Sequence, residues 1–245
     1  MSTLLFALLG IAVGSFLNVC IDRLPNGGSI ISPPSKCDTC GRRLKALDLI
    51  PVVSFLLRRG RCRYCKAQIP PRCLWVELGT GVLFGLIWLR FPSSTYAGFV
   101  ACCSAILIVI LVIDLEHQKI FNRVVYPAIG FALIFALIYP EPTLGERLLG
   151  GLLGSGLLFL LAIIYPTGMG MGDVKLMGFI GLVVGFPYVI LALFLSFVLG
   201  GLISGVLLMA GRIGRRDPIA FAPFLALGAL TTLFYGEQIV RWWSR

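Results

Sequence analysis

Residues 101–117, ACCSAILIVILVIDLEH, decide the fold class of this chain. A single serine interrupts the apolar run before it ends at Asp114. A membrane-spanning helix needs about 20 mainly apolar residues, and this stretch is typical of one. The rest of the chain is similar, because 58% of its 245 residues are hydrophobic and only 13% are charged. Soluble domains carry about twice that charged fraction. We therefore predict an all-α polytopic membrane protein.

Apolar runs on both sides of this stretch predict about eight transmembrane helices. The sixth run is short, and a break at Phe186–Pro187 separates it from the seventh. The first run has no Lys or Arg before it, so we expect a retained helix rather than a cleaved signal peptide. Small residues four apart, as in Gly150/Gly154, Gly151/Ser155 and Gly201/Gly205, predict close helix packing. The predicted spans are 3–21, 74–90, 95–113, 122–139, 147–165, 175–186, 188–211 and 218–236.

The basic residues predict an orientation. Of the 21 Lys and Arg residues, 11 lie between Arg23 and Arg72. Because basic loops remain on the cytoplasmic side, we expect this loop in the cytoplasm and both termini outside. Contacts with anionic membrane lipids explain the net charge of +10, so we expect no nucleic-acid partner. The predicted segments are a first transmembrane helix at 1–22, a tetra-Cys loop at 23–73 and a transmembrane core at 74–245.

The cytoplasmic loop contains two Cys-x-x-Cys pairs, CDTC at Cys37 and Cys40 and CRYC at Cys62 and Cys65. Two such pairs at this spacing predict a tetrahedral zinc site. The alternative is two disulfides, which are rare in the reducing cytoplasm. Four cysteine ligands leave no open position for a reacting water, so we expect the zinc to stabilise a small module rather than to catalyse a reaction.

Three of the 11 acidic residues lie at the ends of apolar spans: Glu77, Asp114 and Asp173. An acid at membrane depth is costly and indicates a function. Two predicted spans separate Asp114 from Asp173, so both acids emerge at the same face. Two neighbouring carboxylates share one proton, so that one can activate a water while the other protonates a substrate carbonyl. A structural ion pair of Asp114 with Arg123, or of Asp173 with Lys175, is the alternative that these residues leave open.

A glycine-rich strip, GMGMG at 168–172, precedes Asp173. Glycine can adopt a positive φ or approach another backbone closely, and three glycines in five residues disfavour a helix interior. We therefore expect Gly170 and Gly172 to line the path of an extended peptide substrate. Other hydrolytic chemistry has less support, because His117 is the single histidine and no HExxH or GxSxG pattern occurs.

These segments resemble the type IV prepilin peptidases, a bacterial branch of the GxGD membrane aspartyl proteases. The resemblance covers nearly the whole chain in the expected order. It implies an inner-membrane endopeptidase in which Asp114 and Asp173 are catalytic. Such an enzyme cleaves the short basic leader of type IV prepilins or type II secretion pseudopilins after a glycine, on the cytoplasmic side. The matching segments are GSFLNVCIDRLP (14–25), LIPVVSFLLRRGRCRYC (49–65), PPRCLWVELGTGVLF (70–84), IDLEHQKI (113–120) and GMGD (170–173).

The resemblance leaves three points open. Relatives often have Pro where Phe121 stands, which bears on the turn into the next span. Many relatives also methylate the new N-terminus with S-adenosylmethionine, but this chain shows no glycine-rich nucleotide loop. Glu77 matches an acidic position of the family, and we expect it to contact the substrate N-terminus, with a structural role at the helix end as the alternative.

Two other functions remain as alternatives. One is a proton-linked transporter that uses the two acids as a relay. The other is a non-catalytic zinc-loop scaffold of a pilus or secretion machine. The oligomeric state is not predicted.

Overall fold

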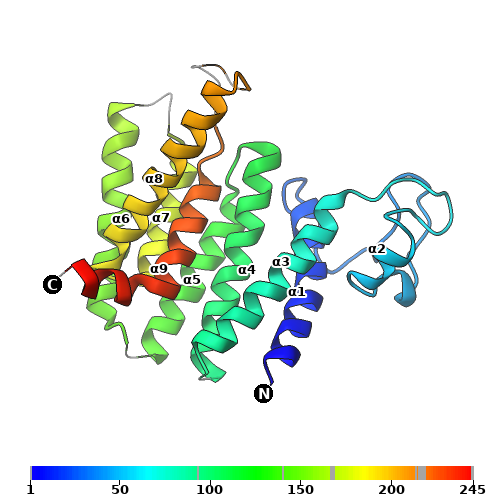
Figure 1. Cartoon of the computed structure of the whole chain (residues 1–245), viewed down its shortest axis with the longest axis horizontal. Helices are drawn as coiled ribbons and strands as arrows, with labels where there is room; N and C mark the ends of the chain where they lie inside the picture. The colour runs from blue at the N-terminus through cyan, green and yellow to red at the C-terminus, as the bar shows by residue number, and fades with distance from the viewer. Residues whose placement is uncertain are drawn as a thin grey trace. The chain divides into compact units, whose positions relative to one another are not determined.

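The computed structural model describes residues 2–92, 94–139, 141–165, 169–212, 214 and 219–243 (Figure 1). No strand lies within these ranges, so the all-α prediction is confirmed. The elements are α1 (Thr3–Arg23), the 3-10 helix η1 (Ala46–Asp48), α2 (Val53–Leu57), α3 (Pro71–Arg90), α4 (Ser94–His117), α5 (Asn122–Ile138), α6 (Leu144–Ile164), α7 (Met171–Val184), α8 (Tyr188–Met209) and α9 (Ala222–Trp243).

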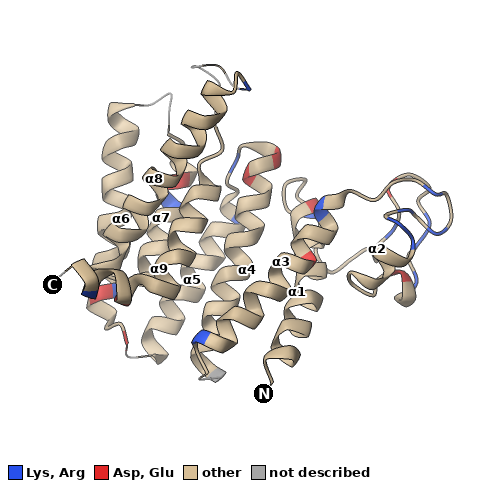
Figure 2. Ribbon diagram, viewed as in Figure 1, with Lys and Arg blue, Asp and Glu red and all other residues tan. Residues whose placement is uncertain are grey.

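Five of the described helices, α1, α3, α4, α6 and α8, are long and apolar enough to cross a membrane. This makes the chain a multi-pass membrane protein, in which most charged residues lie in loops or near helix ends (Figure 2). Helices α5 and α7 have 17 and 14 residues, fewer than the about 20 that a span needs. The count of eight spans therefore stays a prediction. The break before Pro187 is confirmed, because α7 ends at Val184, the next residue Gly185 has φ +74, and α8 begins at Tyr188.

The chain divides into two compact units, Met1–Val109 and Ile110–Arg245. In the first unit, α1 packs along α3. A Cβ added at Gly14 would lie 2.8 Å from Cα of Glu77, and one at Gly10 would also overlap α3. Only glycine permits this approach, so the two helices form a tight hairpin. The ring of Phe6 lies 5.5 Å from that of Phe84 across the hairpin and adds aromatic packing.

In the second unit, α7 lies among α5, α6, α8 and α9, and most of its side chains are buried. The predicted small-residue packing is confirmed for α6, where Gly150 meets the backbone of Gly181 and Gly154 meets Val189. For Gly201 and Gly205 the prediction is wrong within the described chain. No described atom lies within 4 Å of a Cβ built there, because this face of α8 is turned away from the neighbouring helices.

A fully buried arginine, Arg147, fixes the C-terminal end of α7. Its guanidinium donates to the carbonyl of Leu182 at 3.2 Å and to those of Pro142 and Glu141 at 3.0 Å. The last carbonyls of a helix lack intrahelical partners and carry partial negative charge, so a buried cation stabilises them. Helix α7 is thereby held at the end opposite to Asp173.

Candidate functional site

Asp114 lies in the last turns of α4 and is buried, with 5% of its surface exposed. Its Oδ2 accepts a hydrogen bond of 3.1 Å from the backbone N–H of Ala222, the first residue of α9. The N–H groups at a helix start lack intrahelical partners and favour negative charge. Ala222 could not be predicted from the sequence, because no charge or motif marks a backbone donor so distant along the chain.

Asp173 is the third residue of α7, where its Oδ2 accepts a hydrogen bond of 3.3 Å from the backbone N–H of Gly170. The charges of Asp114 and Asp173 interact, so the second unit brings the two acids into electrostatic contact. Helices α5 and α6 lie between them in sequence, and the crossing of the membrane by α5 stays a prediction. The catalytic role of the two acids stays a prediction.

The glycines before Asp173 differ from one another. Gly170 has φ −81 and ψ 146, an extended conformation that any residue can adopt, so a positive φ is not found there. Gly172 lies in the first turn of α7, where the irregular backbone that we expected is replaced by helix. Its Cβ would lie 2.8 Å from Cβ of Ile120, so this glycine permits a close approach within the protein. Gly168 is outside the described residues. The substrate-path role of Gly170 and Gly172 stays a prediction.

Lys175 connects the start of α7 to α5. Its Nζ donates to Oδ1 of Asn122 at 2.9 Å and lies 5.1 Å from the ring centre of Tyr126. The amide of Asn122, which follows the unusual Phe121, thus contributes to the packing of the segment that carries Asp173.

Glu77 belongs to the first unit, where 8% of its surface is exposed. Its Oε2 accepts a hydrogen bond of 2.7 Å from the backbone N–H of Val52, the residue before α2. This contact joins the tetra-Cys loop to α3 and gives Glu77 a structural partner. The expected contact with the substrate N-terminus is untested and stays a prediction.

The four loop cysteines form one cluster. All four Sγ atoms lie within 4.8 Å of one another, and those of Cys37 and Cys65 are 3.8 Å apart. Each pair is followed by a left-handed residue, Gly41 at φ +67 and Lys66 at φ +61, whose N–H donates back to the first cysteine of the pair. The two turns therefore have the same construction. The four residues Cys37, Cys40, Cys62 and Cys65 could hold a metal ion.

The thiols of the cluster differ in charge state: despite a hydrogen bond from Ala67, burial and hydrogen bonds with the other three thiols raise the pKa of Cys65 to about 11, whereas that of Cys37 is lowered. Hydrogen bonds from the backbone N–H groups of Cys40 and then Thr39 lower the pKa of Cys37 to about 6. The thiolate is the form that binds a metal. The first turn thus favours the charge state that a metal requires.

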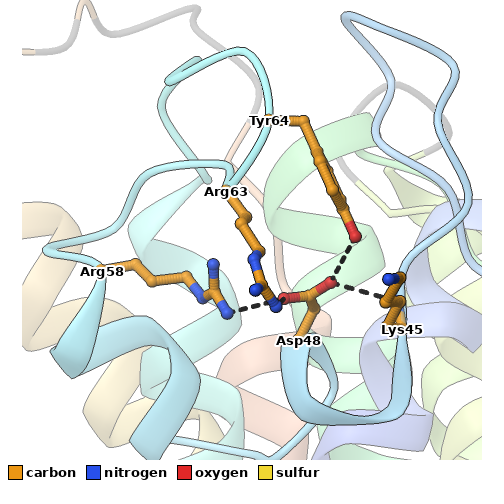
Figure 3. A network of polar contacts seen from close by, with 5 residues as sticks. All are labelled: Lys45, Asp48, Arg58, Arg63 and Tyr64. Atoms are coloured by element: carbon orange, nitrogen blue, oxygen red, sulfur yellow. Dashed lines mark hydrogen bonds and ion pairs between the residues drawn. The ribbon is translucent and has the colours of Figure 1, made fainter.

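Asp48 is the centre of a polar network in the tetra-Cys loop (Figure 3). Its Oδ1 pairs with Arg58 at 2.7 Å and with Arg63 at 3.9 Å. Its Oδ2 accepts hydrogen bonds from the N–H of Lys45 at 3.1 Å and the hydroxyl of Tyr64 at 3.2 Å. Burial opposes ionisation, but the hydrogen bonds from Lys45 and Tyr64 and the charges of Arg58 and Arg63 hold the pKa of Asp48 below its usual range.

The Asp48 network stabilises the second cysteine turn, because Arg63 and Tyr64 are the two residues between Cys62 and Cys65. The guanidinium of Arg42 also lies 4.8 Å from the ring centre of Tyr64. In the sequence nothing distinguishes Asp48 from the other acids of the loop, whereas its side chain is only 5% exposed. A local charge count could not show which loop segments meet around it.

Fold and site define a multi-pass membrane protein with a tetra-Cys loop and, in its second unit, a pair of interacting carboxylates. Two family profiles match the chain. The Bacterial Peptidase A24 N-terminal domain covers residues 8–91, and the Type IV leader peptidase family covers residues 101–205.

Relatives extend over the whole chain. A prepilin leader peptidase/N-methyltransferase of Bacillus subtilis is 33% identical over 245 residues, which are 100% of this chain and 98% of the relative. Proteins of the same name from Stutzerimonas stutzeri and Pseudomonas aeruginosa are 31% and 30% identical, covering 94% and 96% of this chain and 90% of each relative. No solved structure matches significantly. The chain belongs to the type IV leader peptidase family.

Proposed function

We propose that this chain is an aspartyl endopeptidase of the bacterial inner membrane that removes the basic leader of type IV prepilins or type II secretion pseudopilins. Cleavage follows a glycine on the cytoplasmic side. The observation that carries the proposal is the electrostatic contact between Asp114 and Asp173, both of which lie in the family's matching segments. Family membership and the names of the relatives support it.

The proposed reaction uses both carboxylates. The ionised member takes a proton from a water, whose oxygen attacks the carbonyl carbon of the scissile peptide bond. The protonated member donates to the carbonyl oxygen. The C–N bond then breaks, and a proton passes to the leaving amine. The N–H groups of Ala222 and Gly170 hold one oxygen of each acid, which leaves the other oxygens for water and substrate.

Zinc suits the cysteine cluster. A tetrahedral site with Zn–S distances of about 2.3 Å has sulfur–sulfur edges of about 3.8 Å. The separation of 3.8 Å between Cys37 and Cys65 fits that edge. Bound by Cys37, Cys40, Cys62 and Cys65, the metal would have no open position and would stabilise the loop. No step of the hydrolysis passes through it.

The methyl donor is a different case. The names of the relatives imply S-adenosylmethionine, whose carboxylate would suit free N–H groups at a glycine-rich helix start. In the glycine-rich turn before α7, the N–H group of Gly170 is not available to a ligand, because it donates a hydrogen bond to Asp173. This turn therefore gives no support to a site for the cofactor, and we derive no methylation step. Mass spectrometry of the processed pilin N-terminus, with and without S-adenosylmethionine, tests this activity.

Asparagine variants test the peptidase. In vesicles containing the full chain and a synthetic prepilin, Asp114→Asn and Asp173→Asn should each lower the cleavage rate by about 10²-fold or more, since proton transfer is lost. Glu116→Gln, at the end of the same helix as Asp114, is the control and should cleave normally. Normal cleavage by both asparagine variants would refute the pair. Proton flux through the parent chain without cleavage would instead support the transporter alternative. Loss of pilus or secretion function in cysteine variants but not in the two asparagine variants would support the scaffold alternative.

A further inference from the structure

The tetra-Cys loop has an apolar surface that neither the metal cluster nor the peptidase explains. It begins at Leu49, directly after η1, and continues through α2 in the sequence LIPVVSFLL at 49–57. Val53, Leu56 and Leu57 lie on one face of α2 at spacings of three and four residues, whereas Leu49 and Ile50 precede the helix. All five are exposed: Leu49 by 43%, Ile50 by 42%, Val53 by 49%, Leu56 by 60% and Leu57 by 81%.

The opposite side of α2 faces the loop itself. A Cβ built at Gly60 would lie 2.9 Å from the ring of Phe55, so Phe55 packs against the following turn. Helix α2 therefore buries one aromatic side chain and leaves its larger apolar face uncovered. An apolar face of this kind, exposed in an otherwise polar and basic loop, indicates contact with an apolar environment outside the described chain.

The position of α2 along α3 suggests what this environment is. The ion pair of Arg72 with Asp22 links the ends of α3 and α1 and fits the headgroup level. Glu77 lies about 7.5 Å further along α3 at a rise of about 1.5 Å per residue. Its side chain reaches back toward the helix start and accepts the hydrogen bond from Val52. The start of α2 is thus held between the headgroup level and the first turns of a membrane span.

Basic residues border the apolar face. Arg58, Arg59 and Arg61 follow it directly, and Lys45 precedes it. In Figure 2 the loops around α2 carry the basic residues, whereas α2 itself is uncharged. An apolar face bordered by Arg and Lys matches the boundary between acyl chains and anionic headgroups.

We propose that residues 49–57 are an interfacial segment, whose apolar face inserts into the headgroup–acyl boundary of the anionic bilayer that α1 and α3 span. The inserted face would fix the tetra-Cys loop on the membrane surface, with the bond from Val52 to Glu77 as its second attachment. This proposal does not depend on the peptidase activity.

Photo-crosslinking of the full chain tests the proposal. The protein carries p-benzoylphenylalanine at Leu57 and is reconstituted, without substrate, in vesicles of phosphatidylethanolamine and phosphatidylglycerol. Mass spectrometry should find lipid adducts at Leu57 about tenfold above those at Asp38, an exposed control position beside a metal ligand. Equal yields at the two positions, or an adduct at Leu57 with a second copy of the chain, would overturn the proposal. When prepilin is added to the vesicles in a second experiment, replacement of the lipid adduct by an adduct with prepilin would also contradict the proposal.

Hydrogen exchange gives an independent test. In the same vesicles, the double variant Leu56→Gln/Leu57→Gln should exchange the amides of α2 about tenfold faster, because its face no longer inserts. Leu57→Met keeps the face apolar and is the matched control. Unchanged metal content and unchanged exchange in α1 and α3 show that the variants are folded. If the double variant exchanges like the parent while folded, the segment is not membrane-bound.

Discussion

At the scale of single residues, the two acids are held by backbone groups, and neither forms an ion pair with another residue that the structure describes. Asp114 receives the N–H of Ala222, and Asp173 receives that of Gly170. The cation nearest in sequence to Asp173, Lys175, is directed to Asn122 on α5. This arrangement leaves the other oxygen of each carboxylate available for the proposed proton chemistry.

The two glycines of the GMGD segment should respond differently to alanine. Gly172→Ala would place a Cβ 2.8 Å from that of Ile120 and should cost about 1–3 kcal/mol of folding free energy or displace Asp173. Gly170→Ala brings a Cβ only to 3.4 Å from Asp173 at an ordinary φ of −81. Prepilin cleavage and thermal unfolding should therefore be impaired in the first variant and nearly normal in the second. Equal loss of cleavage in both variants would instead favour the substrate-path role.

The backbone donor to Asp114 can be removed by a proline. Ala222→Pro deletes the N–H at the first position of α9, where proline is compatible with the helix. A hydrogen bond to a charged group is worth about 1.5–3 kcal/mol, so kcat for cleavage should fall about tenfold or more. Ala222→Gly keeps the N–H and serves as the control. A normal kcat in the proline variant, with insertion verified, would show that this contact does not position Asp114.

At the scale of elements, the apolar runs predicted most long helices within a few residues. The largest shifts of helix starts are at α7, which begins at Met171 rather than at 175, and at α9, which begins at Ala222 rather than at 218. The largest shift of a helix end is also at α9, which continues to Trp243 rather than to 236. Both starts depend on tertiary contacts. Gly172 fits against Ile120, and the first N–H of α9 meets Asp114. A hydropathy pattern predicts the apolar middle of a helix, but it does not predict the tertiary contact that determines where the first turn begins.

The Asp48 network makes a prediction for the tetra-Cys element. Asp48→Asn removes the charge that binds Arg58 and Arg63, so the turn between Cys62 and Cys65 should lose its support. We expect zinc affinity, measured by chelator competition on the full chain, to fall about tenfold, the low end for residues that orient metal ligands. Asp38→Asn is the matched control, since Asp38 lies between two ligands but is exposed. A similar loss in both variants would indicate a general effect of charge.

At the scale of the whole molecule, the orientation in the membrane can be tested at three loops. The basic residues place Lys119 inside, and strict alternation then places Glu141 and Phe186 outside. The structure agrees that the last two positions lie at one end of the second unit, because the N–H of Phe186 donates to the carbonyl of Glu146 at 2.9 Å.

Reporter fusions at these positions measure both orientation and the number of spans. A fluorescent protein should be active after Lys119, and alkaline phosphatase after Glu141 and Phe186, because each reporter works on only one side. The fusion after Phe186 is the critical one, since α7 has only 14 residues. Phosphatase activity after Glu141 but not after Phe186 would show that α7 does not cross, and that the chain has fewer than eight spans.

The sequence by itself determined the membrane class, the approximate positions of the long helices and the grouping of the four cysteines. These features depend on local hydropathy and on short spacings, which a linear chain displays directly. Only the tertiary structure decided what holds each functional group. The N–H of Ala222 on Asp114, the contact of Gly172 with Ile120 and the burial of Asp48 all join segments that are distant in sequence. Backbone donors and glycine contacts have no side-chain signature, so they become visible only when the helices are packed.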